Sequence, residues 1–138
     1  MARYFITGGG TGGHIYPAIA VADYLKDDEV FYVGNPKNLE YEIVKQKGYK
    51  FLGVNVHGMP RKASFALLKW GFELSMAVLK ACYYILKYKP DAIFGTGGYV
   101  SAPALIGAKL LKVPYMMHDC DAQPGLVTRK LAPSAKCV

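Results

Sequence analysis

Two glycine-rich segments, each following a short apolar run and preceding a helix-like stretch, constrain the fold of this 138-residue chain most strongly. They are residues 8–14 (GGGTGGH) and residues 95–99 (GTGGY). A strand that ends in glycines and leads into a helix exposes backbone N–H groups at the positive end of the helix dipole. Such a turn binds phosphate or pyrophosphate. Two of them in one chain predict a ligand that is held from two sides.

Apolar runs and helix-like stretches alternate along the whole sequence. The runs expected as strands are residues 3–6, 30–33, 51–54, 92–94 and 115–118, with a sixth beginning at residue 135. The stretches expected as helices are residues 17–25, 39–47, 64–87, 101–111 and 125–131, and Pro17 suits the first turn of its helix. This alternation predicts an α/β fold with a Rossmann-like, doubly wound parallel sheet. Both glycine-rich segments then lie at the carboxyl ends of strands, where such folds bind ligands.

The composition limits the classes of function that the chain can have. Its length fits one domain, and no linker or low-complexity segment interrupts it. Three cysteines without a CxxC pair predict reduced thiols, with no disulfide and no metal site. The net charge of +7 favours anionic partners, but the lysines are scattered without a basic–aromatic pattern, so no nucleic acid is expected. We expect no signal peptide, because only residues 4–6 are apolar before the glycines begin.

Three interpretations of the first glycine-rich segment differ in the ligand that they predict. Its spacing satisfies a dinucleotide fingerprint, but that site needs a carboxylate after the second strand, where Asn35 stands. The spacing also satisfies a nucleotide P-loop, but His14 and Ile15 replace the lysine and the hydroxyl residue of that motif. The third interpretation is a pyrophosphate or sugar-nucleotide site with His14 at the mouth of the helix. A neutral imidazole there can accept a proton from a sugar hydroxyl or orient a phosphate, unless His14 only caps the loop.

Further segments extend the pattern along nearly the whole chain. In order, they are residues 8–18 (GGGTGGHIYPA), 89–91 (KPD), 97–103 (GGYVSAP), 113–118 (VPYMMH) and 124–129 (PGLVTR). With these segments the chain resembles the MurG family of bacterial peptidoglycan synthesis. The pair of glycine motifs is the specific part of the match, because related sugar transferases share the first motif alone.

The resemblance implies a fold, a reaction and a place of action. The family has two Rossmann-like domains that face a cleft (the GT-B architecture), and residues 1–138 look like the N-terminal, acceptor-binding half. The C-terminal half, which holds most UDP-GlcNAc contacts, is absent from this chain. The implied reaction is inverting transfer of GlcNAc from UDP-GlcNAc to the C4 hydroxyl of undecaprenyl-pyrophosphoryl-MurNAc-pentapeptide (lipid I), which yields lipid II. No metal or other cofactor is implied, and the protein is expected to be peripheral on the cytoplasmic face of the cell membrane.

The resemblance also assigns roles to residues by position. His14 is the candidate catalytic residue, which activates or orients the acceptor. The implied donor-binding residues are Thr11, Gly12, Gly13 and Asp121. The implied residues around the acceptor diphosphate are Gly9, Gly10, Gly97, Gly98 and Tyr99. The family usually reads Glu-Gln-Asn after His118, whereas this chain reads DCD at residues 119–121. A carboxylate at Asp121 is unfavourable beside a donor diphosphate unless it is protonated or turned away.

The long helix expected at residues 64–87 is apolar over most of its surface. It is long enough to span a bilayer, but its charged residues Lys69, Glu73 and Lys80 make spanning costly. We therefore expect residues 76–86 to pack on the sheet and the N-terminal end to contact an anionic membrane surface. The residues expected at the membrane are Phe65, Leu68, Lys69, Trp70 and Phe72. An ordinary core helix is the simpler alternative, but it leaves the aromatic residues near its start unexplained.

Three other functions fit part of the pattern. The chain can be the acceptor-binding and membrane-anchoring subunit of a two-chain glycosyltransferase. It can also be a non-catalytic module that binds polyprenyl diphosphates, or, least in keeping with Asn35, a nicotinamide dehydrogenase. The parent transferase remains the function that the sequence favours, and the isolated 138-residue chain is expected to be inactive without a donor domain.

Overall fold

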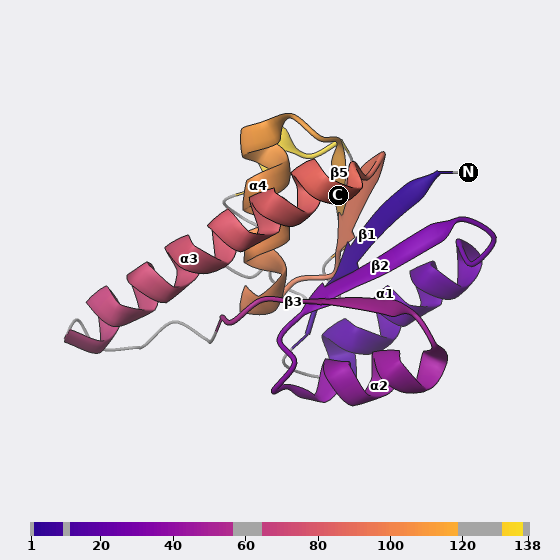
Figure 1. Ribbon diagram of the computed structural model, residues 1–138, viewed down its shortest axis with the longest axis horizontal. Helices are drawn as coiled ribbons and strands as arrows, with labels where there is room; N and C mark the ends of the chain where they lie inside the picture. Colours follow the sequence, from indigo (N-terminus) through magenta and orange to yellow (C-terminus); the bar gives the residue numbers. More distant parts are fainter. Residues whose placement is uncertain (1, 10–11, 57–64, 119–130, 137–138) are drawn as a thin grey trace.

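The computed structural model describes residues 2–9, 12–56, 65–118 and 131–136, and it shows a parallel sheet covered by helices on both faces (Figure 1). The five strands are β1 (Arg3–Thr7), β2 (Glu29–Gly34), β3 (Lys50–Gly53), β4 (Ala92–Gly95) and β5 (Tyr115–Met117). They lie in the order β3-β2-β1-β4-β5, and every neighbouring pair is parallel. The chain therefore builds the sheet outward in two directions from β1, as a doubly wound fold does.

In the described part of the chain, four helices and one 3₁₀ turn follow the strands in alternation, and a second 3₁₀ turn comes after β5. They are α1 (Gly12–Tyr24), α2 (Leu39–Lys47), α3 (Phe65–Tyr88), η1 (Tyr99–Ser101), α4 (Ala102–Leu111) and η2 (Ala132–Ser134). The strands alternate in the direction of their side chains, so Ile6 packs with α1 while Phe5 packs on the side of α3 and α4. Each face of the sheet thus has its own apolar core, and α1 and α2 cover one while α3 and α4 cover the other.

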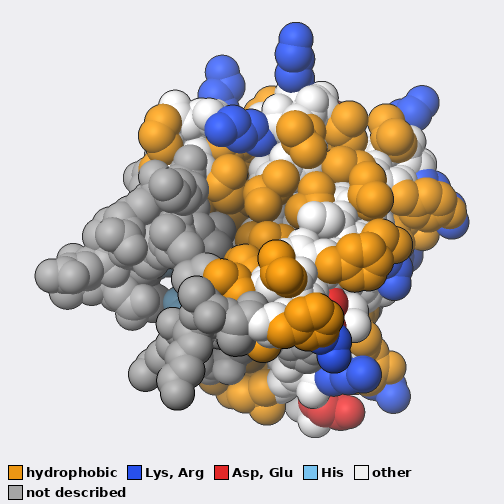
Figure 2. All heavy atoms as spheres, turned by 90° about the vertical axis from the view of Figure 1, so that its left-hand side faces the viewer, with side chains coloured by type: hydrophobic (Ala, Val, Ile, Leu, Met, Phe, Trp, Pro, Cys, Tyr) orange, Lys and Arg blue, Asp and Glu red, His pale blue; other side chains and the backbone are white. Residues whose placement is uncertain are grey.

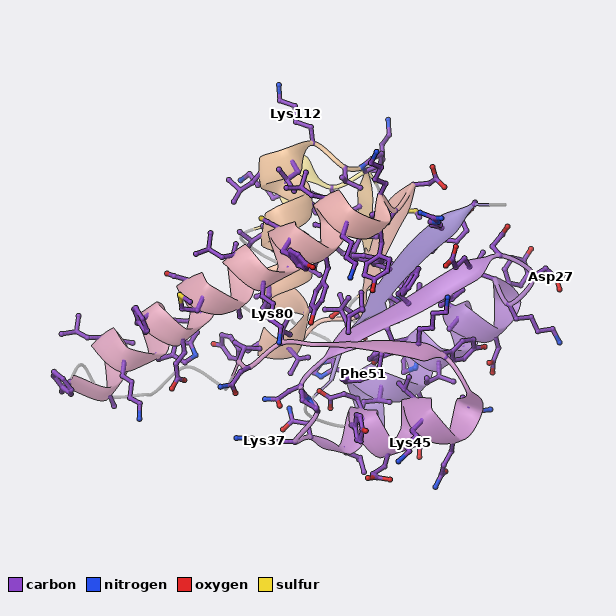
Figure 3. The ribbon with its side chains drawn as sticks, in the orientation of Figure 1. Asp27, Lys37, Lys45, Phe51, Lys80 and Lys112 are labelled. Carbon is purple, nitrogen blue, oxygen red and sulfur yellow. The ribbon has the colours of Figure 1, made fainter. Side chains whose placement is uncertain are left out.

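The surface of these layers carries the charge. Asp27 and Lys112 project from the surface in the segments that follow α1 and α4 (Figure 3). Phe51 is a residue of β3, and its side chain packs against α2. The ring of Phe51 stacks on Tyr32, with centroids 6.2 Å apart, and meets Tyr41 edge-on. At the amino ends of the strands, the Glu29 carboxylate forms ion pairs with Arg3 and Lys50.

The predicted fold class is confirmed, and the first five expected strands and the expected helices in the described part of the chain are present with small shifts of boundary, whereas the sixth strand is not. The first helix differs most, because it begins at Gly12 and contains Pro17 in its interior, not in its first turn. Burial explains the difference. Ile15 is fully buried in the core under α1, so residues 12–16 form a helical turn against the sheet although two of them are glycines. The helix expected at residues 125–131 lies almost wholly outside the described residues. Residues 135–136 form no strand, although the Lys136 N–H donates to the Tyr115 carbonyl at 2.8 Å.

Helix α3 corrects a second expectation. Of residues 76–86, only the narrow side formed by Ala77, Ala81 and Ile85 is buried. It packs closely on α4, because a Cβ added at Gly107 of α4 would lie only 3.1 Å from the Ile85 Cδ1. Of the larger apolar side chains in the same segment, Tyr84 is half-buried, and its hydroxyl donates to the Gly53 carbonyl at 2.9 Å. The others face outward: Met76, Leu79, Tyr83 and Leu86. The prediction that residues 76–86 pack on the sheet therefore holds for the buried side of the helix only, because a single helix face cannot bury apolar residues that surround its axis. Within the described residues, no helix combines the length and the apolar character that crossing a membrane requires.

Candidate functional site at the carboxyl edge of the sheet

The two glycine-rich segments leave the sheet from neighbouring strands. Strands β1 and β4 are paired up to Thr7 and Gly95, and the Thr96 N–H donates to the Thr7 carbonyl at 3.0 Å. Each segment then leads into a helical start, the first into α1 and the second into η1 and α4. Two helix N-termini, which favour anions, therefore adjoin at one edge of the sheet.

His14 joins the two segments. It lies half-buried in the first turn of α1, and its carbonyl accepts a hydrogen bond from the Thr96 hydroxyl. Its imidazole ring lies over the second segment, with Cδ2 3.5 Å from the place of a Cβ at Gly97 and Nδ1 3.3 Å from that place at Gly98. The Gly9 carbonyl oxygen lies 2.7 Å from the same place at Gly98. The two segments thus form one surface, as the sequence predicted when it placed a ligand between them.

The second segment is stabilised by Ser101. Its backbone N–H and its hydroxyl both donate to the Gly98 carbonyl, at 3.2 Å and 2.7 Å. Tyr99 is half-buried and meets the ring of Trp70 edge-on, with centroids 5.9 Å apart and planes at 90°. Sequence reasoning missed both Thr96 and Ser101, although both stand inside or beside the quoted motifs. Hydroxyl residues among glycines were the available signal, since such residues commonly bond to the backbone of turns.

Three buried side chains support the first segment from below, and sequence reasoning missed them as well. The Thr7 hydroxyl donates to the Val33 carbonyl at 2.7 Å, and the Tyr32 hydroxyl donates to the Gly8 carbonyl. Burial, with the neighbouring Glu40 second, raises the pKa of Tyr32 well above its usual range. The Glu40 carboxyl lies next to Gly9 and is fully buried. A polar residue inside an apolar pattern is hard to recognise as buried until its partners are known.

Asn35 at the end of β2 is occupied by local hydrogen bonds. Its amide nitrogen donates to the Val56 carbonyl at 3.1 Å, and its side-chain oxygen accepts from the Lys37 N–H at 3.0 Å. Asn35 is also buried, so its side chain is not exposed to a ribose. The position at which a dinucleotide fold places its ribose-binding carboxylate therefore serves to close the loop after β2.

The structure brings only part of the predicted site together. Gly9, His14, Gly97, Gly98 and Tyr99 share the surface described above, and Gly12 and Gly13 open α1 beside it. Three predicted residues, Gly10, Thr11 and Asp121, lie outside the described residues. The donor, acceptor and catalytic roles of all these residues stay predictions.

The predicted membrane residues fall on two faces of α3. Phe65, Leu68 and Phe72 are 82%, 72% and 67% exposed. Trp70 is half-buried and points toward Tyr99, because at 100° per residue it lies about 160° around the helix from Phe72. Lys69 is exposed between these faces. The structure therefore groups Trp70 with the glycine-rich site and not with the exposed apolar residues.

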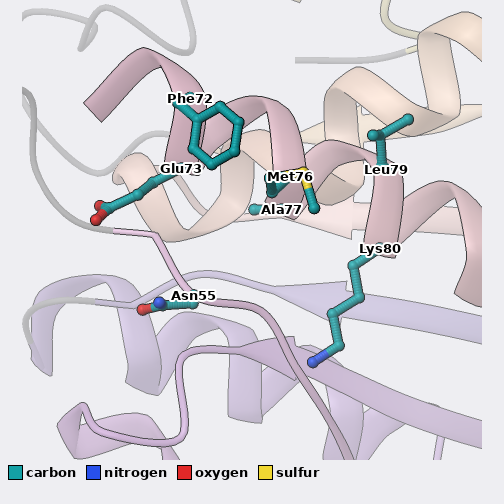
Figure 4. A pocket seen from close by; sticks show the side chains of 7 residues that line it. All are labelled: Asn55, Phe72, Glu73, Met76, Ala77, Leu79 and Lys80. Atoms are coloured by element: carbon teal, nitrogen blue, oxygen red, sulfur yellow. The ribbon is translucent and has the colours of Figure 1, made fainter. Parts of the chain in front are cut away.

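The exposed apolar residues continue along the full length of α3. We call this surface the α3 stripe, and its members are Phe65, Leu68, Phe72, Met76, Leu79, Tyr83 and Leu86. Figure 2 views the end of the molecule from which α3 projects and shows hydrophobic side chains gathered there, with basic side chains around them. Part of the stripe borders a groove of about 580 Å³ between α3 and Asn55, with Glu73 and Lys80 at its sides (Figure 4).

Comparison with known proteins identifies the family. Residues 4–138 match the model described as the glycosyltransferase family 28 N-terminal domain. The chain belongs to this family. This membership agrees with the paired glycine segments and with the buried, hydrogen-bonded Asn35 after β2. It favours the sugar-nucleotide interpretation over the dinucleotide and P-loop interpretations.

Curated relatives carry the name UDP-N-acetylglucosamine--N-acetylmuramyl-(pentapeptide) pyrophosphoryl-undecaprenol N-acetylglucosamine transferase. The relative from Halothermothrix orenii is 43% identical over 133 residues, which are 95% of this chain and 36% of the relative. The relative from Lactococcus lactis subsp. lactis is 43% identical over 134 residues, which are 94% of this chain and 38% of the relative. The chain thus spans little more than a third of the length of these relatives. The resemblance to MurG is confirmed.

Solved structures agree. MurG of Acinetobacter baumannii matches with a TM-score of 0.86 and 28% identity, over 99% of this chain and 40% of that chain. The glycosyltransferase SsfS6 of Streptomyces sp. SF2575 matches with a TM-score of 0.64 and 17% identity, over 97% of this chain and 44% of that chain. The second match, at 17% identity, shows the fold alone.

Proposed function

We propose that the whole protein transfers GlcNAc from UDP-GlcNAc to the C4 hydroxyl of lipid I, and that this chain is its acceptor-binding half. The names of the relatives at 43% identity support the reaction. The observation that carries the proposal is the position of His14, whose ring lies on Gly97 and Gly98 and so unites both glycine-rich segments in one site.

The geometry suits binding of a diphosphate and orientation of a hydroxyl. The N-termini of α1 and of η1 with α4 stabilise the lipid diphosphate, with Gly9, Gly10 and Gly97–Tyr99 around it. His14 orients the C4 hydroxyl or accepts its proton. In this proposal Thr11, Gly12 and Gly13 face the donor, Asp121 lies near it, and no cofactor takes part. Orientation and electrostatic stabilisation by fixed backbone groups then supply most of the rate enhancement.

The test is His14→Ala in the protein expressed from its whole gene, with labelled UDP-GlcNAc and lipid I. We expect kcat to fall by about 10²–10⁴-fold, as loss of general acid–base catalysis does, while lipid I still binds. The control is Tyr24→Ala, at the far end of the same helix and 88% exposed, which should leave kcat unchanged. Undiminished turnover by His14→Ala would overturn the catalytic role. Absence of turnover in the wild type, with lipid binding intact, would favour a binding module.

We also propose that a donor domain outside this chain is required. The 138-residue chain alone should bind lipid I but release no UDP from UDP-GlcNAc. Adding the rest of the gene product, in the same polypeptide or as a separate chain, should restore transfer. Turnover by the isolated chain would contradict this division of labour.

We further propose that the α3 stripe contacts the anionic, cytoplasmic surface of the cell membrane. An apolar side chain contributes about 1.5–3 kcal/mol when fully buried, and a nearby lysine contributes about 1 kcal/mol toward anionic lipid. Lys69, Lys80 and Lys87 are exposed on α3 beside the stripe. Such a surface holds the enzyme where a lipid-linked acceptor resides.

Vesicle flotation tests the membrane contact. Phe72→Glu should weaken binding to vesicles with phosphatidylglycerol by at least about tenfold. Tyr24→Glu, which adds the same charge to an exposed aromatic position on α1, should bind as the wild type does. Equal binding of both variants would refute the contact. Brominated lipids should leave the fluorescence of Trp70, the only tryptophan in the chain, nearly unquenched because its ring faces Tyr99.

A further inference from the structure

Glu40 is a buried acidic residue that the proposed mechanism does not use. It is the second residue of α2, its exposed fraction is 0%, and its carboxyl faces the sheet and not the solvent. Burying a carboxylate is unfavourable unless hydrogen-bond donors surround it. The presence of a buried carboxyl beneath a candidate site therefore needs a physical explanation.

Donors for this carboxyl come from the loop between β2 and α2. Glu40 Oε1 accepts the Asn35 N–H at 3.2 Å and the Asn38 side-chain amide at 3.3 Å. The N-terminus of α2 adds a favourable dipole for a negative charge. The Glu40 carboxyl thus lies at the start of α2, next to Gly9 of the first glycine-rich segment.

Glu40 also explains two glycines that have ordinary backbone angles. A Cβ at Gly9 would lie 2.6 Å from the Glu40 Oε1, and a Cβ at Gly34 would lie 2.9 Å from its Cγ. Neither glycine has a positive φ. The carboxyl therefore fits beside the ends of β1 and β2 only because Gly9, two residues beyond β1, and Gly34, the last residue of β2, have no side chain.

A continuous line of contacts leads from Glu40 to the site. Glu40 packs against Gly9, and the Gly9 carbonyl packs against Gly98, whose other neighbour is the His14 ring. We propose that Glu40 is a positioning residue: it holds Gly9 against Gly98 and so keeps the two glycine-rich segments at the separation that the acceptor diphosphate requires. This inference rests on the proposed transferase function. Glu40 touches no substrate itself, because it is buried beneath the segment.

Three variants of the whole protein test the inference. Glu40→Gln keeps the length of the side chain and an oxygen for both donors, so kcat/KM for lipid I should stay within about threefold of the wild type. Glu40→Asp keeps the charge but is one methylene shorter, so Gly9 loses its support and kcat/KM should fall at least about tenfold. Glu42→Asp is the matched control, because Glu42 is two residues further along α2 and exposed. KM for UDP-GlcNAc should change little in all three.

A second measurement separates positioning from general stability. In the 138-residue chain, the backbone amide signal of Gly98 in an ¹⁵N-correlated NMR spectrum should shift in Glu40→Asp and not in Glu42→Asp. Glu40 packs on Gly9, and the Gly9 carbonyl packs on Gly98, so a shift of the Gly98 signal reports that Gly9 has moved. Glu40→Asp with wild-type kcat/KM, or with an unshifted Gly98 signal, would overturn the positioning role. Lack of turnover in the wild type would instead refute the transferase function, while the NMR result would still decide the contact.

Discussion

In the first glycine-rich segment, glycines make room for side chains of the chain itself, whereas in the second they permit a backbone conformation that other residues avoid. Gly8 and Gly9 leave space for Thr96 and Glu40. Gly97 and Gly98 have φ angles of 103° and 80°, in the region that favours glycine. Similar sequences therefore encode different constraints. The first segment depends mainly on side chains that pack against it, although Gly8 also has a positive φ of 156°, and the second depends mainly on its own backbone, with the close Gly9 carbonyl as an added constraint at Gly98.

The largest effect should come from Gly98, where both constraints act together. Gly98→Ala places a side chain at φ 80° and 2.7 Å from the Gly9 carbonyl oxygen, a backbone atom that cannot move without the glycine-rich segment around it. We expect a loss of at least about 3 kcal/mol in the free energy of unfolding, measured by urea denaturation. Gly71→Ala is the control, since Gly71 lies within α3 and, in the described part of the chain, no side chain and no other element lies within 4 Å of an added Cβ. It should stabilise the chain by about 0.5–1 kcal/mol.

A smaller effect is expected at Gly9, where the obstacle is a side chain. Gly9→Ala displaces the Glu40 carboxyl and weakens its hydrogen bonds, so we expect a loss of about 1–2 kcal/mol. In a Glu40→Ala background the same change should cost less than about 0.5 kcal/mol, and a double-mutant cycle of unfolding free energies measures the difference. Additive costs would show that Gly9 is glycine for another reason.

Gly97 isolates the backbone term. Among the described residues, a Cβ there meets the His14 ring alone, at the ordinary contact distance of 3.5 Å. Gly97→Ala should therefore cost about 1–2 kcal/mol from its φ angle alone. Gly48→Ala, at the end of α2 with φ 84° and open space around it, should cost the same within error. A much larger loss at Gly97 would show that its contact with His14 also matters for stability.

The smallest effect concerns the tyrosine beneath the first segment. Tyr32→Phe removes the hydrogen bond to the Gly8 carbonyl and should cost about 1 kcal/mol at pH 7. Burial raises the pKa of Tyr32 in the folded state, so the folded protein retains the phenolic proton to higher pH than the unfolded chain does. The stability that this provides is present below pH 10 and declines above it. Thermal unfolding from pH 8 to 11 should show the advantage of the wild type over Tyr32→Phe shrinking above pH 10, and a constant difference would contradict it.

The sequence predicted the parts of this molecule that depend on local pattern. Short apolar runs alternating with helical stretches specify strands and helices by their periods of 2 and 3.6 residues, which set the parallel sheet and the carboxyl edge. Glycines after β1 and β4 marked the two segments that meet there. Pro17 misled the prediction because its preference for a first turn is weaker than the burial of Ile15. Trp70 also misled the prediction. An aromatic residue among basic ones is typical of a membrane interface, but the position of Trp70 around the α3 axis directs its ring toward Tyr99.

Periodicity and glycine spacing, read from residues close in sequence, determined the fold class, the family and the location of the candidate site. Tertiary structure alone decided which side chains stand behind the glycines, because Glu40, Thr96 and Tyr32 reach them across 24 to 88 residues or from another strand. It also decided which face of α3 is exposed, since that depends on how closely Ala77, Ala81 and Ile85 approach their neighbours. The residues within a segment determine which secondary structure it can form. The space between elements that are distant in sequence determines which atoms that segment contacts.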